Sequence, residues 1–146
     1  MTEQRFLNSL QTPTQDERTF GLLAHLLQIF TGFMGPLVIL ILKHNSRFVK
    51  FHALQSLIWQ LSFMVLFLSG FAFMFFAAFA TVFHEASRTT HGPTPFPAVF
   101  LLFPLLWLFA IGGWVTNVIL GIVYGIKAQR GEWARYPIIG RFCFPK

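Results

Sequence analysis

Hydrophobic and polar positions fall into long blocks along this chain. Three apolar runs, at residues 20–42, 54–83 and 98–126, are separated by shorter polar segments. A helix needs about 20 apolar residues to cross the roughly 30 Å hydrocarbon layer of a membrane, and each run is long enough. The pattern therefore predicts an all-α integral membrane helical bundle with three hydrophobic segments.

The first run differs from the others because helix-breaking residues interrupt its middle. Thr14 and Glu17 form a T-x-x-E capping box just ahead of it, so we expect a helix to begin directly after Thr14. Gly32, Gly35 and Pro36 follow near the centre, and proline removes a helix donor and clashes with the preceding turn. We predict a segment kinked at Gly35–Pro36, and the alternative is a re-entrant hairpin that turns there.

The second and third runs carry complementary rows of residues at a spacing of four. The second run has a ridge of rings, and the third has a groove of small residues: Trp59, Phe63, Phe67, Phe71, Phe75, Phe79 and Phe83, against Gly113, Asn117, Gly121 and Gly125. Such rows interdigitate when helices pack, and small residues allow close approach in membranes. We expect Trp59 to Phe71 to face this groove. The ridge winds by about 40° per step, so its remainder should face the first helix, another copy or lipid.

Two amides lie at the same expected depth in these runs. Gln60 is six residues from Leu54, and Asn117 is nine residues from Ile126, which places them within about 5 Å in depth if the helices are antiparallel. We predict a hydrogen bond between Gln60 and Asn117, or a shared polar partner. Alternatively, either amide caps a carbonyl of its own helix.

Length and composition agree with one membrane domain. The 146 residues are 55% hydrophobic and only 11% charged, whereas soluble domains carry about 25% charged residues. So few charges cannot cover the surface of an ordinary soluble protein. We expect a flexible tail at residues 1–13, a single transmembrane domain at 14–141 and a short C-terminal end at 142–146. The single cysteine, Cys143, excludes an intramolecular disulfide.

The charge distribution predicts the orientation. Because the basic residues flank the apolar runs, we expect anionic lipid headgroups, not nucleic acid, as partners. Eight of the 11 Lys and Arg lie in the 43–52 connection or after Ile126. The positive-inside rule then places these segments on the cytoplasmic side of the cell (inner) membrane, with the N-terminus outside unless the first run is a hairpin. The residues expected at this interface are Lys43, Arg47, Lys50, His52, Arg130, Trp133, Arg135 and Tyr136.

Candidate chemistry is sparse. The sequence has no P-loop, no CxxC and no recognisable pair of nucleophile and base. In a three-span arrangement His25 and His52 would lie about 26 Å apart, too far to share a metal or haem, whereas the hairpin would bring them together and reopen that option. We expect no catalytic residue, no cofactor and no metal, and therefore not an enzyme.

One face of the second run is polar at its start. His52, Gln55 and Trp59 share a helix face at spacings of three and four. This face is either a docking or headgroup site, or it satisfies backbone groups of the adjoining loop and tail. We favour the second interpretation.

Four sequence blocks together carry a family resemblance. They are Leu23-Ala24-His25-Leu26, Gly35-Pro36-Leu37, the stretch from Phe48 to Gln55, and the stretch from Gly131 to Pro137. In this order they resemble a widespread family of small prokaryotic membrane proteins of unassigned function, which is distantly similar to the chloroplast inner-envelope channel subunit for protein import. The resemblance spans about residues 18–141 and implies a helical bundle in a bacterial or archaeal membrane. It supplies no catalytic residues.

Two functional hypotheses follow. The first is a non-enzymatic scaffold bundle that binds other membrane proteins or copies of itself. The alternative is a passive transport or protein-translocation component with a polar path past His25, Gln28, Gln60 and Asn117. The absence of Asp, Glu, Lys and Arg from the three apolar runs argues against a coupled pump.

Overall fold

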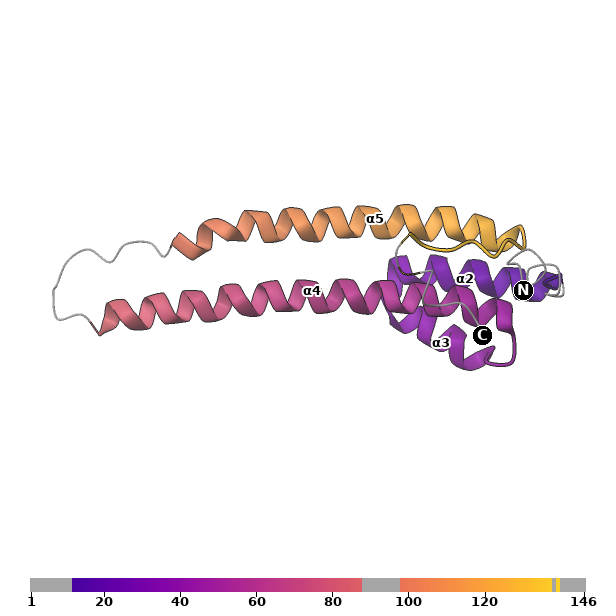
Figure 1. Ribbon diagram of the computed structural model, residues 1–146, viewed down its shortest axis with the longest axis horizontal. Helices are drawn as coiled ribbons and strands as arrows, with labels where there is room; N and C mark the ends of the chain where they lie inside the picture. The colour runs from indigo at the N-terminus through magenta and orange to yellow at the C-terminus, as the bar shows by residue number, and fades with distance from the viewer. Residues whose placement is uncertain (1–11, 88–97, 138, 140–146) are drawn as a thin grey trace, which may run out of the picture. The chain divides into compact units, whose positions relative to one another are not determined.

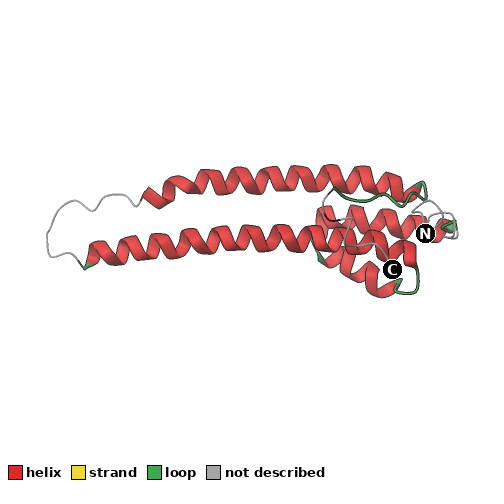
Figure 2. Ribbon diagram, in the orientation of Figure 1, coloured by secondary structure: helices red, strands yellow, loops and turns green. Residues whose placement is uncertain are grey.

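Helices are the only regular secondary structure in the part of the chain that the structure describes. This computed structural model describes residues 12–87, 98–137 and 139 (Figures 1 and 2). The elements are α2 (Gln15–Thr31), α3 (Met34–Leu42), α4 (Arg47–Ala86), the 3-10 helix η1 (Ala98–Leu102) and α5 (Phe103–Gln129). The all-α prediction is confirmed. However, two helical stretches, Arg47–Ala86 and Phe100–Gln129, are long and apolar enough to cross a membrane, where the sequence predicted three.

The first apolar run folds as two helices because the chain turns at Gly32. α2 starts at the predicted capping box, in which the Thr14 hydroxyl accepts from the Glu17 amide and the Glu17 carboxylate accepts from the Thr14 amide. It ends at Gly32, whose φ of 60° favours glycine. The break lies three residues before the predicted Gly35–Pro36. Pro36 instead sits in the first turn of α3, where its missing N–H removes no helix hydrogen bond.

α2 and α3 form a tight antiparallel hairpin. A Cβ on Gly35 would lie 2.5 Å from the Leu27 Cβ, so only glycine allows α3 to approach α2 this closely. Further along, Ile39 of α3 and Ala24 of α2 share a buried cluster with Val49 and Ala53 of α4. The hairpin alternative therefore describes this run, and the single kinked span does not.

The basic connection predicted at 43–52 is shorter than expected. α4 begins at Arg47, and the Ser46 hydroxyl accepts from the Val49 amide at its first turn. The helix includes 40 residues, about 60 Å at 1.5 Å per residue. It begins seven residues before the predicted apolar run because Phe48, Val49 and Phe51 are buried and extend its packed face.

The described chain falls into two compact units. Unit 1 contains the described residues up to Gln60 and from Asn117 onward, and unit 2 contains those from Leu61 to Thr116. The single domain predicted at 14–141 encompasses both. Most of the loop predicted at 84–97, and both predicted terminal segments apart from Thr12 and Pro13, lie outside the described residues.

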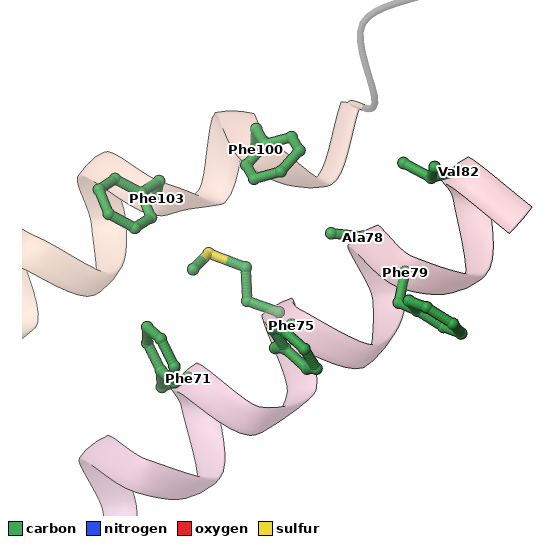
Figure 3. A pocket seen from close by; sticks show the side chains of 8 residues that line it. Phe71, Phe75, Ala78, Phe79, Val82, Phe100 and Phe103 are labelled. Carbon is green, nitrogen blue, oxygen red and sulfur yellow. The ribbon is translucent and has the colours of Figure 1, made fainter.

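Unit 2 is a pair of apolar helical segments with the predicted ring-on-glycine contact. A Cβ on Gly113 would lie 1.9 Å from Phe63 Cε2, and the Phe63 ring stacks on Phe109 with centroids 5.4 Å apart. Further along α4, an apolar groove of about 320 Å³ opens between rings of the two segments (Figure 3). It is lined by Phe71, Met74, Phe75, Ala78, Phe79, Val82, Phe100 and Phe103.

Candidate functional site

Unit 1 is apolar on much of its surface and polar in its centre. Its interior gathers side chains from α2, α4, α5 and the segment 130–137 that follows α5, called here the C-terminal segment. These residues form the polar cluster: His25, Gln28, His52, Gln55, Ser56, Gln60, Asn117 and Tyr136. All except Gln60 are buried. Buried polar groups require hydrogen-bond partners, and a buried polar cluster within an apolar unit is unusual. We therefore take this cluster as the candidate functional site.

Helical spacing brings these side chains together. His25 and Gln28 are three residues apart on α2, and His52, Gln55 and Ser56 lie within one turn of α4, so each set faces the same neighbour. α2 approaches α5 closely at its glycines: a Cβ on Gly121 would lie 2.7 Å from the Ile29 side chain and 2.9 Å from the His25 carbonyl. The glycines therefore allow α2 to bring its polar residues into the centre of unit 1.

His25, His52 and Tyr136 form a directed hydrogen-bond chain. His52 Nε2 lies 3.1 Å from the Glu132 carbonyl, which can only accept, so this nitrogen carries the proton. His52 Nδ1 then accepts from His25 Nε2 at 2.9 Å. His25 Nδ1 in turn accepts a hydrogen bond from a hydroxyl, with Tyr136 and Ser56 both at 2.8 Å. One arrangement of neutral imidazoles thus satisfies all four ring nitrogens.

The amides form the second half of the cluster. Gln60 Nε2 donates to Asn117 Oδ1 at 2.7 Å, which is the predicted pair, and also lies 2.9 Å from the Gln28 carbonyl. Gln28 Nε2 donates to the Tyr136 hydroxyl at 3.1 Å. Tyr136 therefore joins the amides to the histidines.

The polar face of α4 holds the C-terminal segment. His52 donates to the Glu132 carbonyl, Gln55 Nε2 donates to the Ala134 carbonyl at 3.2 Å, and the Tyr136 amide donates to Gln55 Oε1 at 2.6 Å. The interpretation that His52 and Gln55 satisfy tail backbone is confirmed. The segment follows the end of α5 at Gln129. Gly131, whose φ is 80°, and the bond from the Glu132 amide to the Lys127 carbonyl form a Schellman cap there.

Charged groups lie at the edge of unit 1. Lys43 pairs with Asp16 at 2.5 Å, and the Ser46 hydroxyl donates to Glu17 at 2.7 Å. The Ser46 bond, with the bonds from Thr14, lowers the pKa of Glu17 below its ordinary value. Burial raises the pKa of the Tyr136 phenol, so this hydroxyl stays protonated and able to donate.

The predicted helix-packing residues divide between two neighbours. Phe63 packs on Gly113 and Gln60 bonds Asn117, as expected. Gly121 and Gly125, however, receive Ile29 and Leu22 of α2 and not the rings of α4. Because the ridge winds around α4, its rings cannot follow the whole groove. Trp59 lies near Tyr136, with centroids 6.4 Å apart, and Phe67 lies next to Phe63.

The predicted interfacial residues also divide. Arg47, Lys50 and Arg130 are exposed, Lys43 and Arg135 are partly exposed, and Trp133 packs edge-on against Phe48 with centroids 5.1 Å apart. His52 and Tyr136 are instead buried, with 0% and 2% exposed, inside the polar cluster. Both lie in the core because the helical hairpin covers the face that was predicted to meet headgroups.

The separation of about 26 Å expected for a three-span arrangement does not apply, because the hairpin brings His25 and His52 into contact, as that alternative predicted. Their facing nitrogens hydrogen-bond each other, however, and the described residues include no group of three or more His, Cys, Asp or Glu placed to hold a metal. The sequence pattern did not identify Tyr136 and Ser56 as members of the cluster. Tyr136 is 111 residues from His25, and no local pattern connects the two.

One comparison with known proteins gives a match. A family model described as the magnetosome magnetite crystal formation protein family matches residues 16–143. No curated protein and no solved structure matches the chain. None of these comparisons supports a similarity to the chloroplast import channel.

Proposed function

The chain belongs to the magnetosome magnetite crystal formation protein family, and from this we propose that it is a non-enzymatic scaffold of the membrane in which magnetite crystals form. It acts by associating, through its apolar helices, with copies of itself or with other membrane proteins. The family and the two long apolar helices support membrane residence.

The closed hydrogen bonding of the polar cluster is the observation that carries the proposal. A catalytic or transport site needs polar groups that are free to meet a substrate, whereas these side chains bond to each other and to backbone groups. Within the described ranges, Gln129 Oε1 is the one buried side-chain N or O atom without a partner. The cluster therefore serves to hold α2, α4, α5 and the C-terminal segment together.

The aromatic ridge of α4 supplies the surface for association. Phe75 and Phe79 have 57% and 63% of their surface exposed, and both border the groove shown in Figure 3. Helices associate in membranes through shape-complementary packing, because lipid offers no hydrophobic driving force. A ridge of rings beside a groove provides such a shape.

The basic edge of unit 1 fits anionic headgroups on the cytoplasmic side. Arg47, Lys50 and Arg130 are exposed, and each basic side chain near an anionic membrane surface contributes about 1 kcal/mol. We therefore propose that the start of α4 and the end of α5 lie at the same membrane surface.

A translocation component is the second candidate, because His25, Gln28, Gln60 and Asn117 do converge in one cluster. Conductance distinguishes the two functions. Purified protein in planar bilayers should carry no current as a scaffold, and a reproducible unitary current would favour the translocation role.

Association is tested by removing rings from the ridge. The Phe75→Leu/Phe79→Leu variant keeps apolar character but loses the shape of the ridge. The control is Phe73→Leu/Phe76→Leu, which alters two rings that are each 67% exposed at other angles around α4. After cross-linking in magnetosome-forming cells, we expect only the ridge variant to lose adducts and to alter crystal dimensions. Unchanged adducts and crystals in the ridge variant would contradict the proposal.

A further inference from the structure

We infer that the α2–α3 hairpin is a re-entrant element that enters one leaflet, contacts its acyl chains and returns, so that the start of α2 and the end of α5 lie on the same side of the membrane. This inference concerns topology and lipid contact, and it does not depend on the scaffold role.

The geometry of the hairpin brings its two ends together. The turn at Gly32 reverses the chain, Gly35 packs on Leu27, and at the open end Lys43 pairs with Asp16. α3 has nine residues and is therefore about 13.5 Å long. This is about half of the roughly 30 Å hydrocarbon layer, so the hairpin reaches the middle of the membrane and does not cross it.

Contacts within unit 1 place the tip of the hairpin beside the interior of the candidate spans. Ile29, near the tip, lies against Gly121 of α5, and the Gln28 carbonyl accepts from Gln60 of α4. Gly121 is eight residues before the end of α5 at Gln129, which is about 12 Å along the helix. The tip is therefore inside the hydrocarbon layer if α4 and α5 cross it.

The outer surface of the hairpin suits acyl chains and not water. Residues 20–42 contain no formal charge, and one outer face of the hairpin is apolar and exposed: Phe30 83%, Met34 52%, Val38 46%, Ile41 63% and Leu42 64%. Two polar side chains of the apolar part of α2, His25 and Gln28, are instead buried and hydrogen-bonded in the polar cluster, as polar groups at membrane depth require.

The charge distribution independently favours this topology. If the hairpin returns, Arg5 and Arg18 join the basic residues of the 43–52 connection and the C-terminal end. Ten of the 11 Lys and Arg then lie on one side, with Arg88 alone on the other. A single span would leave eight against three. The stronger asymmetry is the one that the positive-inside rule favours.

Side-specific labelling tests the topology. In a Cys143→Ser background, single cysteines are placed by Gln15→Cys at the start of α2, Arg130→Cys after α5 and Ser87→Cys after α4, all exposed positions. A membrane-impermeant maleimide is applied to right-side-out and inverted vesicles. We expect Gln15→Cys to label from the same side as Arg130→Cys and from the side opposite to Ser87→Cys. Labelling of Gln15→Cys together with Ser87→Cys would overturn the inference.

Spin labels test the lipid contact. Nitroxides are attached at Met34→Cys and Val38→Cys, and the protein is placed in vesicles of phosphatidylcholine and phosphatidylglycerol. Dissolved oxygen should increase the relaxation rate of these labels, whereas a water-soluble nickel complex should leave it unchanged. A label at Arg130→Cys should show the reverse. If the α3 labels respond to nickel as strongly as the Arg130→Cys label, the face meets water. If they respond to neither reagent, a protein surface covers it. Either result overturns the lipid assignment.

Discussion

Phe63 and Gly113 are in contact so close that a Cβ on Gly113 would fall 1.9 Å from Phe63 Cε2. Real Cβ atoms do not approach other atoms to this distance, so a side chain at this position would force the Phe63 ring to move away from α5. The neighbouring Gly112 has nothing within 4 Å of its Cβ position. The two glycines therefore form a matched pair for substitution.

Gly113→Ala should destabilise the protein by about 1–3 kcal/mol, because the added methyl overpacks a close contact. Gly112→Ala should stabilise it by up to about 1 kcal/mol, since alanine is the better helix former. Unfolding in mixed detergents, followed by circular dichroism, measures both changes. If Gly113→Ala and Gly112→Ala had equal free energies of unfolding, the result would contradict the close contact of Phe63 with Gly113.

Replacing Gln60 and Asn117 should reveal a coupled pair. Their 2.7 Å hydrogen bond should contribute a coupling of about 0.6 kcal/mol, the average for side-chain bonds in membranes. The free energies of unfolding of Gln60→Leu, Asn117→Leu and the double variant complete the cycle. Strictly additive losses would remove the pairing.

The stability of the helix start should depend on pH through Glu17. The pKa of this carboxyl is lowered in the folded protein, mainly by the bond from Ser46. Its contribution is therefore present above the unfolded value, near 4.5, and is lost as the pH falls through the lower folded value. Between about pH 5 and pH 3, the wild type should lose more stability than Glu17→Gln. Ser46→Ala should show a reduced loss, and identical pH profiles for all three proteins would contradict this assignment.

Tyr136→Phe should cost about 1–3 kcal/mol, because removing the hydroxyl takes a hydrogen-bond partner from both His25 Nδ1 and Gln28 Nε2 inside the buried cluster. Tyr124→Phe is the control, since the Tyr124 side chain is only partly buried and its ring lies beside Tyr136. The same unfolding experiment measures both. Limited proteolysis should also cut the C-terminal segment faster in Tyr136→Phe, whereas equal cutting rates would argue that the hydroxyl does not hold it.

Features that depend on spacing within one helix, or between two matching helices, were predictable from the sequence. The Thr14–Glu17 capping box, the contact of Phe63 with Gly113 and the Gln60–Asn117 pair all have this origin. The periodicity of a helix shows which residues share a face, and matching depths then indicate a partner.

Helical spacing could not predict the hairpin or the burial of the C-terminal segment. Glycine and proline mark a kink and a turn alike, and the choice of Gly32 depends on how α3 packs against α2. Tyrosine is a residue type that is common at membrane interfaces. The burial of Tyr136 depends on its contact with His25, which is distant in sequence. Tertiary contacts decide both outcomes.

The position of Tyr136 has a consequence for how the protein is made. Tyr136 leaves the ribosome 111 residues after His25, roughly 5 to 20 seconds later at ordinary rates of synthesis. During this interval the imidazole and amide groups of α2 lack the phenol that completes their bonding. If α2 inserts during synthesis, its polar groups enter the membrane before the interior is complete, and the centre of the nascent chain stays unfinished until Tyr136 arrives.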